Sequence, residues 1–193
     1  GRPDAPFSVS SRLRLEPDGV AVSNARIEIG DSQILASADW RWGAAPRLDI
    51  SAEGQKIDIA PIAPGSLDFT SPPGPETASV NPRFAETGSV PLMRIAERMA
   101  AVERMVGSLR ISLKAQELTD GQTRLRDVDA DLAVKGGTLT LTSAAATSAS
   151  GARAELQGQI SGMQTKPAGT LRGWASASGR EAMASLLEAL PVG

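Results

Sequence analysis

The chain has 193 residues, enough for one ordinary domain with a real core or for two small ones. It contains no cysteine and no histidine, which excludes disulfides, thiolate chemistry, His-dependent triads and the usual zinc sites. The net charge of −2 comes from mixed acidic and basic residues, so the chain lacks the concentrated basic surface that binds nucleic acid.

The first 60 residues alternate between apolar and polar side chains, the pattern of β-strands with one covered face. Turn residues interrupt this alternation at the spacing of an antiparallel meander. The apolar side is concave in this interpretation, and its residues either form a core or face a lipid. We assign to that groove Leu13, Leu15, Val20, Val22, Ile27, Ile34, Ala36, Trp40, Leu48 and Ile50.

Residues 61–90 are rich in Pro, Ser and Gly and lack periodicity, which predicts a linker. Apolar residues then recur three or four positions apart, which predicts a helix over 91–106 that ends at Gly107. Because the charges of this helix are balanced, we expect it to pack on its own sheet and not on a membrane. A second short helix is predicted after the capping box at 178–181.

The alternation of the first stretch returns later in the chain, displaced by 119 residues (132 − 13). Leu13 then falls on Leu132, and Val22 falls on Leu141. A change of parity between Val22 and Ala25 recurs at the same displacement, which chance alternation would not produce. Later, with longer turns, Leu48 is matched with Leu171.

These patterns predict a mainly β fold with two short helices, in which two repeats of antiparallel meander form a curved, twisted sheet with one apolar face. Residues 1–60 form the first β-repeat, 61–90 the linker, and 91–193 a helix plus the second β-repeat, ending in a short helix.

No catalytic signature is visible, and we expect no enzyme, cofactor or metal site. Asp127, Asp129 and Asp131 are spaced like the start of a calcium loop, but the required Gly and Glu are missing, so a solvated strand face is favoured. A carboxylate-dependent hydrolase is a third, weaker reading, because the chain has few aromatic residues to stack on sugars.

Three stretches resemble the AsmA-like family of bacterial envelope proteins, which is related to the TamB and AsmA bridge-like lipid transporters. They are "VAVSNARIEIGDSQILASADWRWGAAPRLDISAEGQKIDI", "LRDVDADLAVKGGTLTL" and "GREAMASLLEAL". The second repeat departs from the pattern at Gly158, Gly173 and 144–146, where its apolar lining is thin.

The resemblance implies an internal segment of a periplasmic protein whose inner-membrane anchor lies outside this segment. Such a protein binds or conducts phospholipid along an apolar β-groove toward the outer membrane and supports outer-membrane assembly. The implied partners are phospholipid acyl chains, neighbouring repeats of the same chain and envelope proteins.

The alternative is an envelope scaffold or interaction module that aids outer-membrane protein assembly and holds no lipid. From the residues alone, apolar faces that merely cover each other or the helices are favoured, because alternation reports burial and not the identity of the cover.

Overall fold

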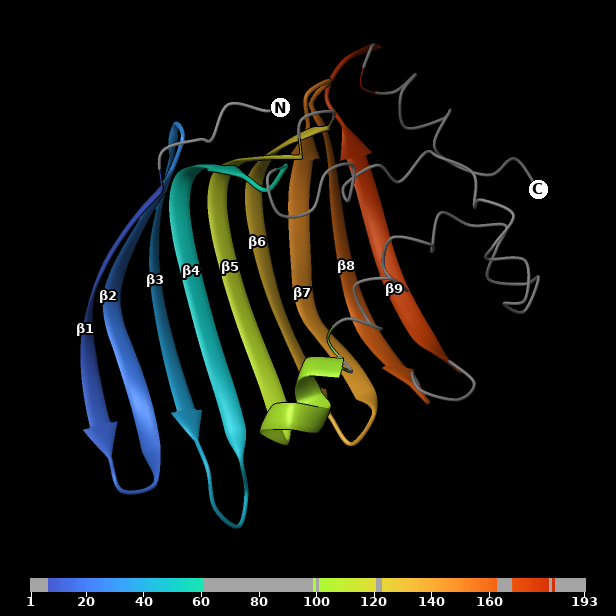
Figure 1. The fold of residues 1–193 in the computed structure, drawn as a ribbon. Helices are drawn as coiled ribbons and strands as arrows, with labels where there is room; N and C mark the ends of the chain where they lie inside the picture. Colours follow the sequence, from blue (N-terminus) through green and yellow to red (C-terminus); the bar gives the residue numbers. More distant parts are fainter. Residues whose placement is uncertain are drawn as a thin grey trace, which may run out of the picture.

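The computed structural model describes residues 7–60, 99, 101–120, 123–162, 168–180 and 182. Strands make up 76% of these residues and form one open sheet, ordered as in the chain (Figure 1). The strands are β1 (Phe7–Glu16), β2 (Gly19–Ile29), β3 (Ser32–Arg41), β4 (Arg47–Asp58), β5 (Ser108–Thr119), β6 (Arg124–Lys135), β7 (Thr138–Ser148), β8 (Ala152–Ser161) and β9 (Ala168–Ala177). The predicted mainly β, twisted sheet of meander repeats is confirmed.

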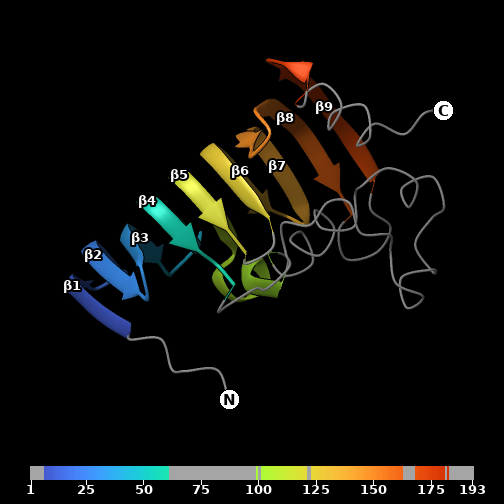
Figure 2. The ribbon, with the colours of Figure 1, turned by 90° about the horizontal axis from the view of Figure 1, so that it is seen from above.

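Two antiparallel meanders, β1–β4 and β5–β9, are joined side by side into this single sheet. The junction is the one parallel pair of the described residues, β4 with β5. Parallel neighbours need a crossover connection, and the chain returns to the start of β5 through a helix that lies against one face of the sheet (Figure 2). The two edges of the sheet are β1 and β9.

The internal repeat is visible in the strand pairing. The register between β2 and β3 shifts between Val22 and Ala25, and the register between β7 and β8 shifts between Leu141 and Ala144. Each shift is a β-bulge, in which one extra residue turns the following side chains to the other parity. In β2 the bulge contains Asn24, whose φ of 51° is in the left-handed region that Asn tolerates. The parity change in the sequence therefore marks the same bulge in both repeats.

One part of the predicted repeat alignment is wrong. Ile50 pairs with Ala38, and Leu171 pairs with Gly158, the counterpart of Ala38. Leu171 is therefore the counterpart of Ile50 and not of Leu48. A slip of two residues leaves an alternating pattern unchanged, so only the strand register could reveal it.

Of the predicted helices, the structure describes only parts. Met99 and residues 101–106 are helical, as are Arg180 and Ala182. The rest of both predicted helices and the predicted linker at 61–90 lie outside the described residues. Within the described residues no helix is long and apolar enough to cross a membrane.

The core of the described region consists of two clusters on one face of the sheet, towards opposite ends of the strands. The first, here called the helix-covered cluster, contains Met99, Val106, Leu109, Val134, Leu139 and Ile160. The second contains Ile57, Ala115, Leu118 and Val128. Because Met99 and Val106 come from the helix, this helix packs on its own sheet, as predicted.

Two contacts hold the helix in place. Glu103 is buried, and both oxygens of its carboxylate accept a hydrogen bond from the backbone N–H of Gly137, at 3.1 and 3.3 Å. At the end of the helix, Gly107 has a φ of 82° and lies so close to Pro46 that a Cβ would stand 2.5 Å from its ring. The helix is thus fixed to the β6–β7 turn and to the segment before β4.

Candidate functional site: the apolar face

The strand register aligns the apolar residues of all nine strands into rows that cross the sheet. Residues that pair across neighbouring strands point to the same face, so the pairs can be followed from one edge to the other. One row contains Leu15, Val20, Trp40, Leu48, Leu109, Val134, Leu139, Ile160 and Gly169. The next contains Leu13, Val22, Ala38, Ile50, Ile111, Leu132, Leu141, Gly158 and Leu171.

Two further rows have smaller side chains. The third contains Ala25, Ala36, Ala52, Leu113, Ala130, Ala144, Leu156 and Gly173. The fourth begins with Val9, Ile27, Ile34, Gly54, Ala115 and Val128. All ten groove residues named from the sequence lie in these four rows, on one face of β1–β4.

The rows differ in how much solvent reaches them. Leu13 and Leu15 on the edge strand β1 are 62% and 74% exposed, and Trp40 on β3 is 41% exposed. The other seven groove residues, Val20, Val22, Ile27, Ile34, Ala36, Leu48 and Ile50, are partly buried. Ile50 and Leu48 pack against the helix-covered cluster, whereas Ile34 packs against the second cluster. Three of the ten residues are thus exposed, three pack against the core clusters, and the remaining four are partly buried without belonging to either cluster.

Two indoles stand at the open end of this face. Trp40 and Trp42 form an edge-to-face pair with ring centroids 5.6 Å apart, and Trp42 Nε1 donates a hydrogen bond to the carbonyl oxygen of Pro17 at 3.1 Å. Both remain 41% exposed, so neither is a core aromatic residue.

Sequence reasoning missed the most buried residues of the face. Val134, Leu139 and Leu109 are more buried than any of the ten groove residues, yet they belong to the second half of the chain. The signal that could have found them is the repeat itself, because Val134 and Leu139 are the counterparts of Leu15 and Val20. These residues are buried because the helix packs on them. The alternation of apolar and polar residues does not show where the helix lies.

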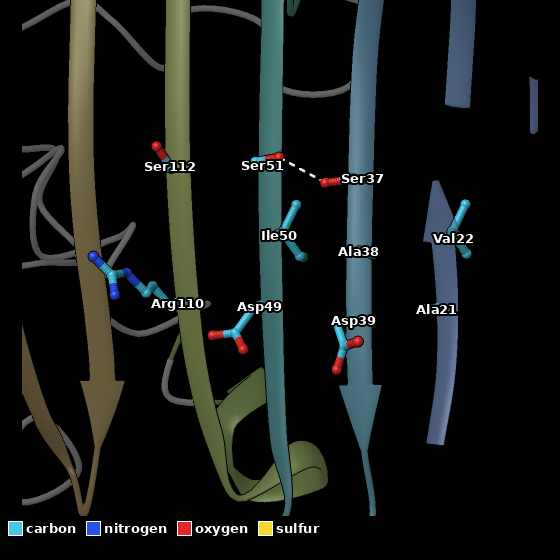
Figure 3. A pocket seen from close by; sticks show the side chains of 10 residues that line it. All are labelled: Ala21, Val22, Ser37, Ala38, Asp39, Asp49, Ile50, Ser51, Arg110 and Ser112. Carbon is cyan, nitrogen blue, oxygen red and sulfur yellow. Dashed lines mark hydrogen bonds between the residues drawn. The ribbon is translucent and has the colours of Figure 1, made fainter. Parts of the chain in front are cut away.

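The opposite face is polar and has a shallow hollow of about 490 Å³ over β2–β5 (Figure 3). Ala21, Ser37, Asp39, Asp49, Ser51, Arg110 and Ser112 of the polar face line it, and it is also bordered by Val22, Ala38 and Ile50, which belong to the second apolar row. The hydroxyls of Ser37 and Ser51 are hydrogen-bonded at 2.8 Å. Asp39 and Asp49 pair across β3 and β4 on this face.

Ion pairs neutralise the charges around the hollow. Arg41 donates to Asp39 at 2.8 Å, and this hydrogen bond holds the pKa of Asp39 below its usual value. Arg110 donates to Asp131 at 2.9 Å, which raises the pKa of Arg110. Asp129 lies 3.7 Å from Lys114. No group of acidic side chains suited to a metal ion occurs among the described residues, and the polar face there is a surface of paired charges.

Comparisons with family models, with curated proteins and with solved structures gave no match to this chain. The AsmA-like resemblance therefore rests on the quoted motifs, and the function must be inferred from the geometry of the apolar face.

Proposed function

We propose that the apolar face binds the acyl chains of phospholipids without catalysing a reaction on them. In this proposal the chain is a segment of an AsmA-like periplasmic protein, anchored in the inner membrane, that conducts phospholipid toward the outer membrane and supports its assembly. One observation carries the proposal: apolar rows cross all nine strands, and Leu13, Leu15 and Trp40 of these rows are exposed to solvent.

The energetics suit a ligand of this kind. Keeping a sixteen-carbon acyl chain in water costs roughly 12 kcal/mol, at about 0.8 kcal/mol for each CH₂. Strands of ten to twelve residues span about 33–40 Å, which exceeds the ~30 Å hydrocarbon core of a bilayer, so an acyl chain fits along them. The rows contain aliphatic residues and Trp40 but no charged side chain, so they offer contact without fixing a ligand at one position.

The helix favours the second candidate function, an envelope scaffold or interaction module that holds no lipid. Met99 and Val106 cover the first row over β5–β8, and the Glu103 contact with Gly137 fixes the helix there. In this view, the exposed residues near β1 contact a protein and not an acyl chain.

Native mass spectrometry of the gently purified protein distinguishes the two functions. Lipid binding predicts a second mass series, displaced by one phospholipid, whose adduct is recovered by solvent extraction. A single apo series, both from cells and after incubation with phospholipid vesicles, would contradict lipid binding and support the scaffold.

A further inference from the structure

In the described part of the chain, the outer edge of β9 lacks the residues that usually prevent strand pairing. Within the part of the chain that the structure describes, β9 pairs only with β8. Free strand edges usually carry Lys, Pro or several charges, which prevent another strand from adding. Over its ten residues β9 has neither Lys nor Pro, and Arg172 is its one charged residue. Nine of the ten residues are exposed, all except Ala177. The other edge, β1, is different, because it carries Arg12, Arg14 and Glu16.

The internal repeat indicates which kind of strand can pair with the outer edge of β9. By strand register, β9 is the counterpart of β4, since β3 pairs with β4 as β8 pairs with β9. The outer edge of β4 is occupied by β5, in parallel, with Ile50 paired to Ile111. This neighbour leaves Ile50 partly buried, whereas its counterpart Leu171 is 39% exposed. The edge of β9 therefore repeats an edge that, within this same sheet, already has a partner.

We propose that the outer edge of β9 binds a further β-strand of the β5 type, added in parallel. The added strand has large aliphatic residues at every second position, as β5 has Leu109, Ile111 and Leu113. In the register of the β4–β5 pair, its three aliphatic residues lie opposite Gly169, Leu171 and Gly173. The two glycines present no side chain of their own to such a neighbour, and both lie close against β8, Gly169 against the main chain of Gln159 and Gly173 against the side chain of Leu156. The rows of the apolar face then continue onto the added strand.

The partner is a strand from a further unit of this architecture and not a second copy of the described sheet. In a second copy, β5 is already paired on both sides, with β4 and with β6. The edges that its described residues offer are β1 and β9. Of these, β1 is the counterpart of β6, which pairs with β5 in antiparallel orientation, and β9 is the counterpart of β4. Neither free edge of a second copy is therefore a strand of the β5 type. This inference concerns the sheet edge and does not depend on what the apolar face binds.

Disulfide trapping with a synthetic peptide tests the proposal on the full chain. The probe is a peptide of residues 107–119, which contains β5. Since the chain has no cysteine, one introduced thiol on each molecule gives an unambiguous cross-link. Ser51 pairs with Ser112, and Arg172 is the counterpart of Ser51, so the Arg172→Cys protein should trap the Ser112→Cys peptide. Both positions lie on the polar face, which leaves the apolar rows unchanged.

Two more positions determine the strand direction. A parallel peptide brings position 110 opposite Thr170 and position 114 opposite Trp174. An antiparallel peptide exchanges these partners. We expect Thr170→Cys and Trp174→Cys proteins to trap the parallel positions about tenfold more than the exchanged ones, because main-chain hydrogen bonds fix the register. Equal yields, or a preference for the exchanged pairs, would overturn the proposal.

A matched control keeps the protein constant and changes only the peptide. Ile111→Pro in the peptide removes a backbone donor from the added strand and should abolish both trapping and the anisotropy change of a labelled peptide on the unmodified protein. Binding that survives this change overturns the proposal. Dimers of Arg172→Cys that form without peptide, together with dimers of the unmodified protein in sedimentation, would assign the edge to a second copy and also overturn it. Phospholipid adducts in native mass spectra are unaffected by any of these outcomes.

Discussion

Replacement of the exposed leucines at the β1 edge tests whether this part of the apolar face contacts an acyl chain. Leu13 is 62% exposed and Leu15 is 74% exposed. Complete burial of a leucine side chain stabilises by about 1.5–3 kcal/mol, so covering the exposed part gains about 1–2 kcal/mol for each. Leu13→Asp or Leu15→Asp should therefore weaken phospholipid binding about 5- to 30-fold. Since both side chains already lie in water, the free energy of unfolding should change by less than about 0.5 kcal/mol.

The assay is a titration of each variant with a fluorescent phospholipid, supported by the adduct fraction in native mass spectra. Leu35→Asp is the matched control, because Leu35 is 50% exposed and lies on the opposite face of β3, where its neighbour on β4 is Glu53. It should bind lipid like the unmodified protein. If Leu15→Asp retains full affinity, or if Leu35→Asp loses as much, the open part of the apolar face is not the lipid contact.

Three further predictions concern the core, the helix and the polar face. Val134→Ala, at the fully buried centre of the helix-covered cluster, should lower the free energy of unfolding in urea by about 1.5–3 kcal/mol. Glu103→Ala removes a charged acceptor, so the Gly137 amide should exchange its hydrogen faster and the unfolding free energy should fall by about 1–3 kcal/mol. Arg41→Gln should raise the pKa of Asp39 in an NMR titration. The lowered pKa means that Asp39 stabilises the fold above its unfolded pKa and loses this effect as the pH falls through the folded value, so the variant should be less sensitive to acid.

Alternation predicted the faces of the strands well because it reports which side of a strand is covered. The parity change at Val22 even located a bulge, since an inserted residue must exchange the two sides of a strand. What alternation does not report is the neighbour of each strand. The parallel pairing of β4 with β5 and the counterpart of Leu171 both depend on hydrogen bonds between distant segments, and a shift of two residues leaves the pattern intact.

For the candidate site, too, the sequence predicted the face on which each residue lies but not how exposed that residue is. The sequence places Leu15 and Leu48 on one face, and the strand register agrees. Yet Leu15 is open to solvent, whereas Leu48 packs against the helix-covered cluster. The difference arises from where the helix lies, and that depends on contacts such as Glu103 with Gly137, between residues 34 positions apart. A period-2 pattern contains no information about such contacts.

The two clusters and the alanine row between them bear on how an acyl chain could cross the sheet. The helix closes the rows at one end of the strands, and the second cluster fills the apolar face at the other. Between them runs the third row, in which Ala36, Ala52 and Ala130 each project a single methyl group. A chain that moved from β1 toward β9 without displacing Met99 would have to follow this row. Leu113 and Leu156 narrow that path on β5 and β8, so, under the proposed lipid binding, we expect an acyl chain to stay near the exposed Leu13 and Leu15 and not to pass rapidly to β9.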